Sequence, residues 1–164
     1  MRDDGRAAAA FIGDVLVACP RCGGAATVTV TGMGAKGVGL PAEAPRPARL
    51  VCRHCGSTRG QRLAPGVTRA YRIAADGRDP YLGLPLWLAT PTRHGALFAF
   101  NADHLAALET IVGASLRERH ALPPTSLRNA TMLSRLPRWM KLARNRDEVL
   151  HGLARLRRKL LASP

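Results

Sequence analysis

The sequence predicts an α+β protein, with short antiparallel strands first, then an apolar β-hairpin, and three or four helices at the carboxyl terminus. Three observations support this fold class. The first 75 residues hold short runs in which apolar and polar residues alternate, separated by glycine and proline. From residue 101 onward, apolar residues recur at the spacing of a helix. Two close cysteine pairs, Cys19 with Cys22 and Cys52 with Cys55, divide the strand region.

The first predicted elements are the strands around these cysteines. Residues 14–18 predict a short strand that leads to the first pair. Residues 26–31 alternate valine with threonine, which is typical of a half-buried strand, and residues 48–51 predict its return partner. Residues 32–47 are rich in glycine, proline and alanine without a period, so we expect a long loop at a hairpin tip. Two further strands are predicted over residues 56–62 and 67–74.

A break at residues 76–80, with the sequence Asp-Gly-Arg-Asp-Pro, predicts a domain boundary. The first predicted domain, over residues 1–75, contains both cysteine pairs and the long loop. The second, over residues 80–164, contains a hairpin and a basic helical region.

The second domain opens on apolar residues. Residues 84–90 and 96–100 are apolar on both faces around Pro91, which indicates a covered hairpin that turns at His94 and Gly95. Its large anchors are Trp87, Phe98 and Phe100. Packing in the core explains these aromatic residues better than a platform for stacked bases.

Helical periodicity begins after Asn101, a residue type that caps helices well. We expect this helix to end near Arg119 and to bury one apolar face. That face consists of Leu105, Leu108, Val112 and Leu116.

A second helical stretch covers residues 127–144, where Pro137 requires a kink or a restart. Asn145, with Glu148 three residues later, predicts a capping box that opens a last helix through Leu161. Its buried stripe is Val149, Leu153, Leu156 and Leu160.

Both cysteine pairs have the pattern Cys-x-x-Cys-Gly, beginning at Cys19 and at Cys52. Two residues between the partners let both sulfurs reach one ion from a tight turn, which favours tetrahedral metal coordination over a disulfide framework. Gly23 and Gly56 suit the positive φ angle that such a turn needs. The sequence shows no export signal, so we expect reduced thiols and a cytoplasmic location.

These turns resemble the knuckles of the zinc-ribbon superfamily, in which a β-hairpin joins two such turns. The resemblance covers roughly residues 14–63 and does not extend to the second domain. It implies one structural zinc ion and no ligand position open for catalysis. The implied ligands are Cys19, Cys22, Cys52 and Cys55. The insert of 29 residues between the pairs departs from the superfamily pattern and implies an extended hairpin tip.

Iron is the competing metal, because Cys-Pro-x-Cys-Gly also occurs in rubredoxins and four thiolates bind either ion. Zinc is favoured, since rubredoxins pack aromatic residues around the iron and this sequence has none between Phe11 and Tyr71. His54 lies inside the second turn and is an alternative ligand. An exposed histidine between two cysteine ligands is the simpler interpretation.

The chain is strongly basic, with a formal net charge of +14. From Arg117 to the end it has twelve lysine or arginine residues and three acidic residues. Basic residues lie opposite the apolar stripes of the last two predicted helices, so these two faces are candidates for binding the phosphates of DNA or RNA. The candidate residues are Arg135, Arg138, Lys141, Arg144, Arg155, Arg158 and Lys159. The competing interpretation is an ordinary solvated surface, with arginines placed well against the helix dipole.

Two other classes of function compete with nucleic-acid binding. A protein-interaction module would dock an acidic partner protein through the ribbon or through residues 84–100. An enzyme has the least support, because the cysteines are committed to metal and the five histidines lack a carboxylate at useful spacing. Asp103 and His104 are adjacent, and adjacent residues point in different directions on a helix. We therefore expect no catalytic residues.

Three further observations concern membranes and nucleotides. No run of 18 apolar residues predicts a transmembrane helix, so we expect no membrane association. Residues 16–19 resemble a lipoprotein cleavage box. A leader peptide needs a basic start and an uninterrupted apolar stretch, and the acidic residues Asp3, Asp4 and Asp14 do not fit this pattern. Residues 32–37 fit the pattern G-x-G-x-x-G, but the prolines that follow exclude the helix that a dinucleotide site needs.

Overall fold

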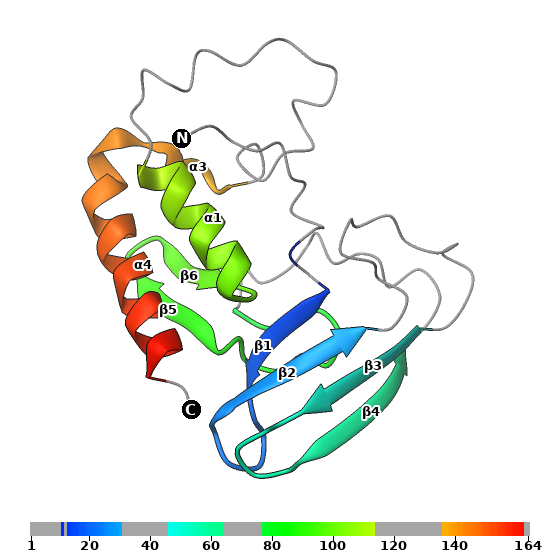
Figure 1. The fold of residues 1–164 in the computed structure, drawn as a ribbon. Helices are drawn as coiled ribbons and strands as arrows, with labels where there is room; N and C mark the ends of the chain where they lie inside the picture. The colour runs from blue at the N-terminus through cyan, green and yellow to red at the C-terminus, as the bar shows by residue number, and fades with distance from the viewer. Residues whose placement is uncertain (1–10, 12, 31–45, 64–76, 114–135, 163–164) are drawn as a thin grey trace.

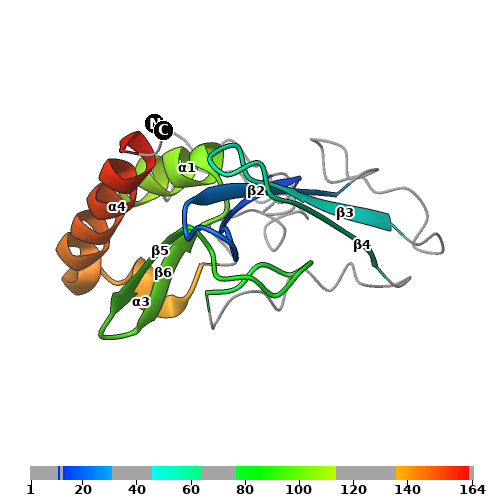
Figure 2. The same cartoon turned by 90° about the horizontal axis from the view of Figure 1, so that it is seen from below.

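The computed structural model describes residues 11, 13–30, 46–63, 77–113 and 136–162. In these segments a four-stranded antiparallel sheet, a two-stranded hairpin and three α-helices form an α+β fold, which confirms the predicted class. The two long helices lie side by side over the hairpin, and the larger sheet extends away from them (Figure 1). Figure 2 shows the same arrangement from below, with the helices and the larger sheet at opposite ends. None of the described helices is long and apolar enough to cross a membrane.

The larger sheet is a meander in which each strand pairs with the next. Its strands are β1 (Asp14–Ala18), β2 (Ala25–Val30), β3 (Arg46–Val51) and β4 (Thr58–Leu63), in that order. The alternation that predicts β2 also sets its faces, because Val28 is buried and Thr29 is exposed. Val15 and Leu50 are the cross-strand neighbours of Val28 and are fully buried. One face of the sheet therefore belongs to the core, and the other is open.

The predicted loop between the cysteine pairs overlaps the start of β3. β3 begins at Arg46, whereas the sequence assigns residues 32–47 to the loop. Pro47 pairs with Arg62 of β4, so the pairing between β3 and β4 extends beyond the end of β2. The rest of this loop and the predicted strand over residues 67–74 lie outside the described residues.

The predicted hairpin is present, with a turn one residue earlier than expected. It consists of β5 (Leu88–Thr92) and β6 (Gly95–Ala99), so Pro91 is inside a strand and faces Ala96. The turn residues are Arg93 and His94. The hydroxyl oxygen of Thr92 accepts the N–H of His94 at 3.1 Å and donates to the carbonyl of Gly95 at 2.7 Å. This hydroxyl closes the turn and leaves Gly95, with a φ of 117°, to open the second strand.

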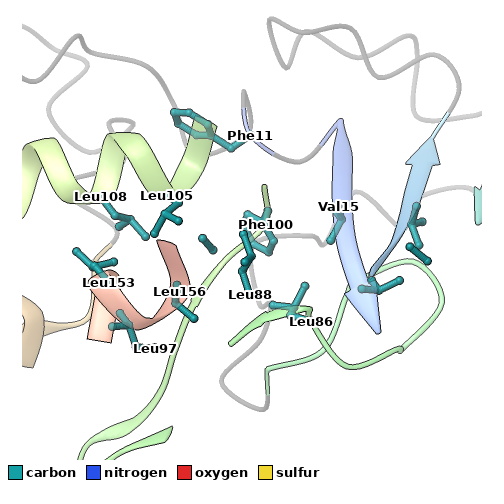
Figure 3. Packing of buried hydrophobic residues seen from close by; sticks show 14 of the residues in the cluster. Phe11, Val15, Leu86, Leu88, Leu97, Phe100, Leu105, Leu108, Leu153 and Leu156 are labelled. Carbon is teal, nitrogen blue, oxygen red and sulfur yellow. The ribbon is translucent and has the colours of Figure 1, made fainter. Parts of the chain in front are cut away.

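The segment before the hairpin joins the larger sheet at β1. Val17 and Leu86 form an antiparallel bridge, and the N–H of Trp87 donates to the carbonyl of Leu16 at 2.9 Å. Buried residues from both sides of the predicted boundary at residues 76–80 belong to one hydrophobic cluster. In Figure 3 this cluster runs from Val15 on β1, past Leu86, to the leucines of the helices.

The first helix, α1 (Ala102–Gly113), has the cap and the buried face that the sequence predicts. The Asn101 side chain accepts the N–H of His104 at 2.9 Å, which is an N-cap hydrogen bond. Leu105, Leu108 and Val112 are buried. Leu116 and the predicted end near Arg119 lie outside the described residues.

The second predicted helix, over residues 127–144, is interrupted where the structure describes it. After Pro137 the chain forms α3 (Arg138–Lys141), and Leu142 is extended, with φ −80° and ψ 130°. A 3-10 turn, η4 (Ala143–Asn145), follows and leads into α4 (Arg146–Leu161). The restart after Pro137 is confirmed, and residues 127–135 lie outside the described part.

The predicted capping box of the last helix is also wrong. Asn145 precedes α4 but makes no side-chain cap hydrogen bond. Its side-chain nitrogen donates to the carbonyl of Trp139 at 2.9 Å, and its oxygen accepts from Arg93 at 3.1 Å. Because Asn145 is only 2% exposed, these tertiary partners hold its amide in place of the cap.

The helices bury the predicted stripe of α4 against α1 and the hairpin. Val149, Leu153 and Leu156 are buried, and Leu160 is half-buried at the edge of the cluster. Figure 3 shows the leucines of the two helices pointing toward one another above Leu97 of β6. This packing fixes α4 beside the hairpin and leaves its opposite face exposed.

Candidate metal centre

The first cysteine pair occupies the turn between β1 and β2. Cys19 directly follows β1, and its N–H donates to the carbonyl of Gly24 at 2.8 Å. Its own carbonyl accepts the N–H of Gly23 at 2.8 Å, so the turn closes on itself around Cys22.

The second pair repeats this turn between β3 and β4. The N–H of Cys52 donates to the carbonyl of Ser57 at 2.9 Å, and its carbonyl accepts from Gly56 at 3.0 Å. The spacings match those of the first turn. Both glycines have a positive φ, 72° at Gly23 and 69° at Gly56. The pattern Cys-x-x-Cys-Gly therefore produces two equivalent knuckles at the same end of the sheet (Figure 1).

The knuckles bring the four predicted ligands together. All four sulfur atoms lie within 4.8 Å of one another. The distance between the sulfurs is 3.7 Å both for Cys19 with Cys55 and for Cys22 with Cys52. Sulfurs bound to one zinc ion at about 2.3 Å in a tetrahedron lie about 3.8 Å apart. The cluster thus has the size of a four-thiolate metal site, with ligands contributed by both knuckles.

The backbone and the crowding of the thiols shift the pKa values within the cluster. The N–H of Cys22 hydrogen bonds to the Cys19 sulfur and lowers the pKa of Cys19 to about 7. The N–H of Gly24 lowers the pKa of Cys22, but desolvation and the other three thiols outweigh it and raise that pKa to about 12. Four thiolates this close repel one another, so their common ionisation requires a cation among them.

The alternative ligand His54 does not join the cluster. It is exposed, and the only metal-sized group of ligands in the described segments consists of the four cysteines. The side chains of Cys19 and Cys52 are buried, while Cys22 is exposed. The centre is therefore closed on the side of the core and reaches the surface at the first knuckle.

The candidate phosphate-binding residues differ in exposure and in whether they have a partner. Arg138, Arg144, Arg155 and Arg158 are exposed, and none of the four has a side-chain partner among the described residues. Lys141 is half-buried and has a partner, and Arg135 lies outside the described residues.

Lys159 differs from the other candidates because it lies against an aromatic ring. Its ammonium nitrogen is 4.1 Å from the centre of the Trp87 ring, which is a cation–π contact. Partial burial there lowers the pKa of Lys159. This lysine is therefore held over the hairpin segment, and its charge remains near the surface.

Three other basic residues stabilise the fold, which the sequence did not predict. The guanidinium of Arg157 donates to both carboxylate oxygens of Glu109, and these hydrogen bonds raise the pKa of Arg157. Arg93 pairs with Glu148 at 2.8 Å. Arg146 donates to the carbonyl at the end of α1. The sequence alone does not distinguish these residues from unpaired basic residues. The partners of Arg93 and Arg157 are about fifty residues away along the chain.

The ribbon, which comprises β1 to β4 and the two knuckles, is a second basic region that sequence reasoning missed. Its described segments, residues 13–30 and 46–63, contain six arginines and a single acidic residue, Asp14. Five of these arginines are exposed: Arg21, Arg49, Arg53, Arg59 and Arg62. The excess of arginines over acidic residues can be counted in the sequence of these segments. It is smaller than the group of twelve basic residues from Arg117 onward, on which the predicted binding faces were based.

Two buried titratable side chains have structural roles. The carboxylate of Asp79 accepts three backbone N–H groups, from Tyr81, Leu82 and Leu84, and fixes the turn before the hairpin. His104 is stacked against Phe100 and accepts the N–H of that residue at 3.1 Å. Asp103 beside it is exposed, so the adjacent acid and imidazole do not face each other.

Comparisons with models of protein families, with curated proteins and with solved structures found no match to this chain.

Proposed function

We propose that the four cysteines hold one zinc ion whose role is structural. Zinc accepts four thiolates in a tetrahedron, and the observed sulfur separations fit that arrangement. Iron binds the same ligands but is redox-active, and the exposed Cys22 would leave it open to oxidants. Thiolate ligands must also stay reduced, so we propose a reducing compartment such as the cytoplasm.

We propose a binding protein in preference to an enzyme. Four protein ligands complete the tetrahedron, so the ion has no position for water or for a substrate. The metal then serves to fix the two knuckles and the sheet between them. Any function beyond metal binding then depends on the side chains at the surface of the molecule.

We further propose that the exposed face of α4 binds the phosphates of a nucleic acid. The observation that carries this proposal is the set of exposed arginines without an acidic partner among the described residues. On α4 itself, His151, Arg155 and Arg158 follow one another at helical spacing on the exposed side. Guanidinium groups bind phosphate oxygens by forked hydrogen bonds and release counterions from the nucleic acid.

The test is a titration of the zinc-loaded full chain with fluorescent duplex DNA, single-stranded DNA and RNA at several salt concentrations. Binding should weaken steeply with salt, and each lost phosphate contact should reduce the slope of log K against log salt by about 0.9 on duplex DNA. The double variant Arg155→Glu and Arg158→Glu should lower both the affinity and the slope.

A matched control is the double variant Arg21→Glu and Arg62→Glu, which makes the same charge change on exposed residues of the ribbon. This control should retain most of the affinity. Equal losses in both double variants would show that net charge, and not the α4 face, governs binding. No binding at low salt would reject the proposal.

A further inference from the structure

A groove lies between the two knuckles and the end of α4, apart from the exposed arginine face. Its volume is about 470 Å³, in the range of sites that hold one or two side chains or a small ligand. In Figure 1, α4 ends near the turns that carry the cysteines. The residues that line it are Leu16, Cys22, Gly24, Ala25, Thr27, Val51, Arg53, His54, Trp87, Leu160 and Ala162.

The floor of this groove is apolar and belongs to the open face of the sheet. Leu16, Thr27 and Val51 are cross-strand neighbours, so they form one row across β1, β2 and β3. Trp87 continues the row, because its backbone pairs with Leu16. Val51 is 37% exposed, so it offers apolar surface on this open face. Leu160 forms the opposite wall.

The rim of the groove is cationic. Arg53 and His54 of the second knuckle line it, and Lys159 lies directly over Trp87. No acidic side chain is among its lining residues in the described part of the chain. An apolar floor with a cationic rim is complementary to an apolar side chain flanked by carboxylates.

The same features disfavour the other occupants. A base cannot stack on the face of Trp87 that Lys159 covers, and the other floor residues, Leu16, Thr27 and Val51, have no ring. A second copy of this chain would bring a formal charge of +14 against a basic rim. The indole N–H of Trp87 is buried and has no acceptor among the described residues.

We propose that this groove binds an acidic peptide segment of a partner protein through one hydrophobic anchor. The anchor side chain sits between Trp87, Val51 and Leu160, and flanking carboxylates pair with Arg53 and Lys159. The site is separate from the arginines of the nucleic-acid proposal, so either proposal can fail while the other stands.

The probe is a displayed library of random dodecapeptides, selected on the zinc-loaded full chain. Enriched sequences should carry a large apolar residue between Asp or Glu residues. Labelled copies of these peptides should bind Arg53→Glu about tenfold more weakly, because the variant places a like charge on the rim. Leu160→Ala should also weaken binding, since it removes one wall of the groove.

The matched control is Arg21→Glu, which makes the same charge change in the first knuckle, at an exposed residue that does not line the groove. It should bind the peptides as the wild type does. In a Trp139→Phe background, Trp87 is the only tryptophan, and its emission should change when peptide binds. Zinc content and melting of each variant establish that it is folded.

Four results would overturn the proposal. They are the absence of enriched peptides, enrichment without acidic residues, equal binding to Arg53→Glu and wild type, and displacement of the peptide by an oligonucleotide. The last result would identify the groove as part of a nucleic-acid surface.

Discussion

At the scale of single residues, each knuckle depends on one backbone angle. An ideal Cβ atom built on Gly23 or on Gly56 meets no other atom within 4 Å, so space does not require glycine at either position. The requirement is the φ angle near 70°, a left-handed conformation that L-residues with side chains resist.

Gly56→Ala should therefore destabilise the zinc-loaded protein by about 1 to 2 kcal/mol through backbone strain alone. Gly60→Ala is the matched control, because Gly60 is exposed on β4, also has open space at the Cβ position and lacks the positive φ. Denaturant unfolding measures both variants. Equal stability of the two alanine variants would refute the strain argument.

His104 is the other residue whose environment has a measurable consequence. Its imidazole is buried between the rings of Phe11 and Phe100, and burial lowers its pKa from 6.5 to about 4. The folded protein thus keeps this histidine neutral in a pH range where the unfolded chain binds a proton.

The free energy of unfolding should consequently be highest above pH 6.5 and decrease as the pH falls toward about 4. The loss from this one group is on the order of 3 kcal/mol. Protonation of the cysteines adds its own acid sensitivity, so the measurement compares wild type with His104→Gln at each pH. Parallel stability profiles of the two proteins would show that His104 does not titrate in this way.

These residues differ in how far the sequence predicts them. The four cysteines and the two glycines are predictable because each knuckle is closed by hydrogen bonds within six residues. The sequence does not reveal the structural roles of Asp79 and His104. His104 depends on Phe11, which is more than ninety residues away and meets it only through tertiary packing.

At the scale of elements, periodicity predicts the helices better than it predicts their ends. The buried faces of α1 and α4 follow from leucine spacing. The extended Leu142 does not, since no glycine or proline marks it. Asn145 explains the break, because its amide joins Trp139 of α3 to Arg93 of the hairpin turn.

Asn145→Ala should destabilise the protein by about 1 to 3 kcal/mol, because it removes a buried amide that is hydrogen-bonded both to the carbonyl of Trp139 and to Arg93. Asn145→Ser distinguishes this role from helix capping. Serine is a good N-cap but is too short to hold both partners, so we expect it to be as damaging as alanine. A serine variant with wild-type melting would restore the capping interpretation.

At the scale of the whole molecule, the ribbon and the helical region share one core. The bridge between Val17 and Leu86 and the cluster around Phe100 connect them. The α+β class and the packing of the helices against the strands were predictable from two different periodicities in one chain. The residues that make the contact, such as Val17 and Leu86, were not, because no local pattern encodes them. The open sheet face, the groove beside it and the exposed side of α4 are consequences of this contact.

The metal should contribute strongly to the stability of this assembly. Structural zinc sites supply about 10 kcal/mol or more in apparent binding free energy, and the four-stranded sheet places only one face in the core. Loss of the ion should therefore loosen the knuckles first, and with them the side of the groove that contains Arg53 and His54.

Native mass spectrometry of the full chain, purified without oxygen, tests the metal centre most directly. We predict one zinc ion per chain, with protons displaced from the thiols, and no zinc in Cys22→Ser, which should also lose the native melting of the ribbon. A wild-type chain that carries iron or no metal, or a Cys22→Ser variant that keeps zinc and native melting, would contradict the account.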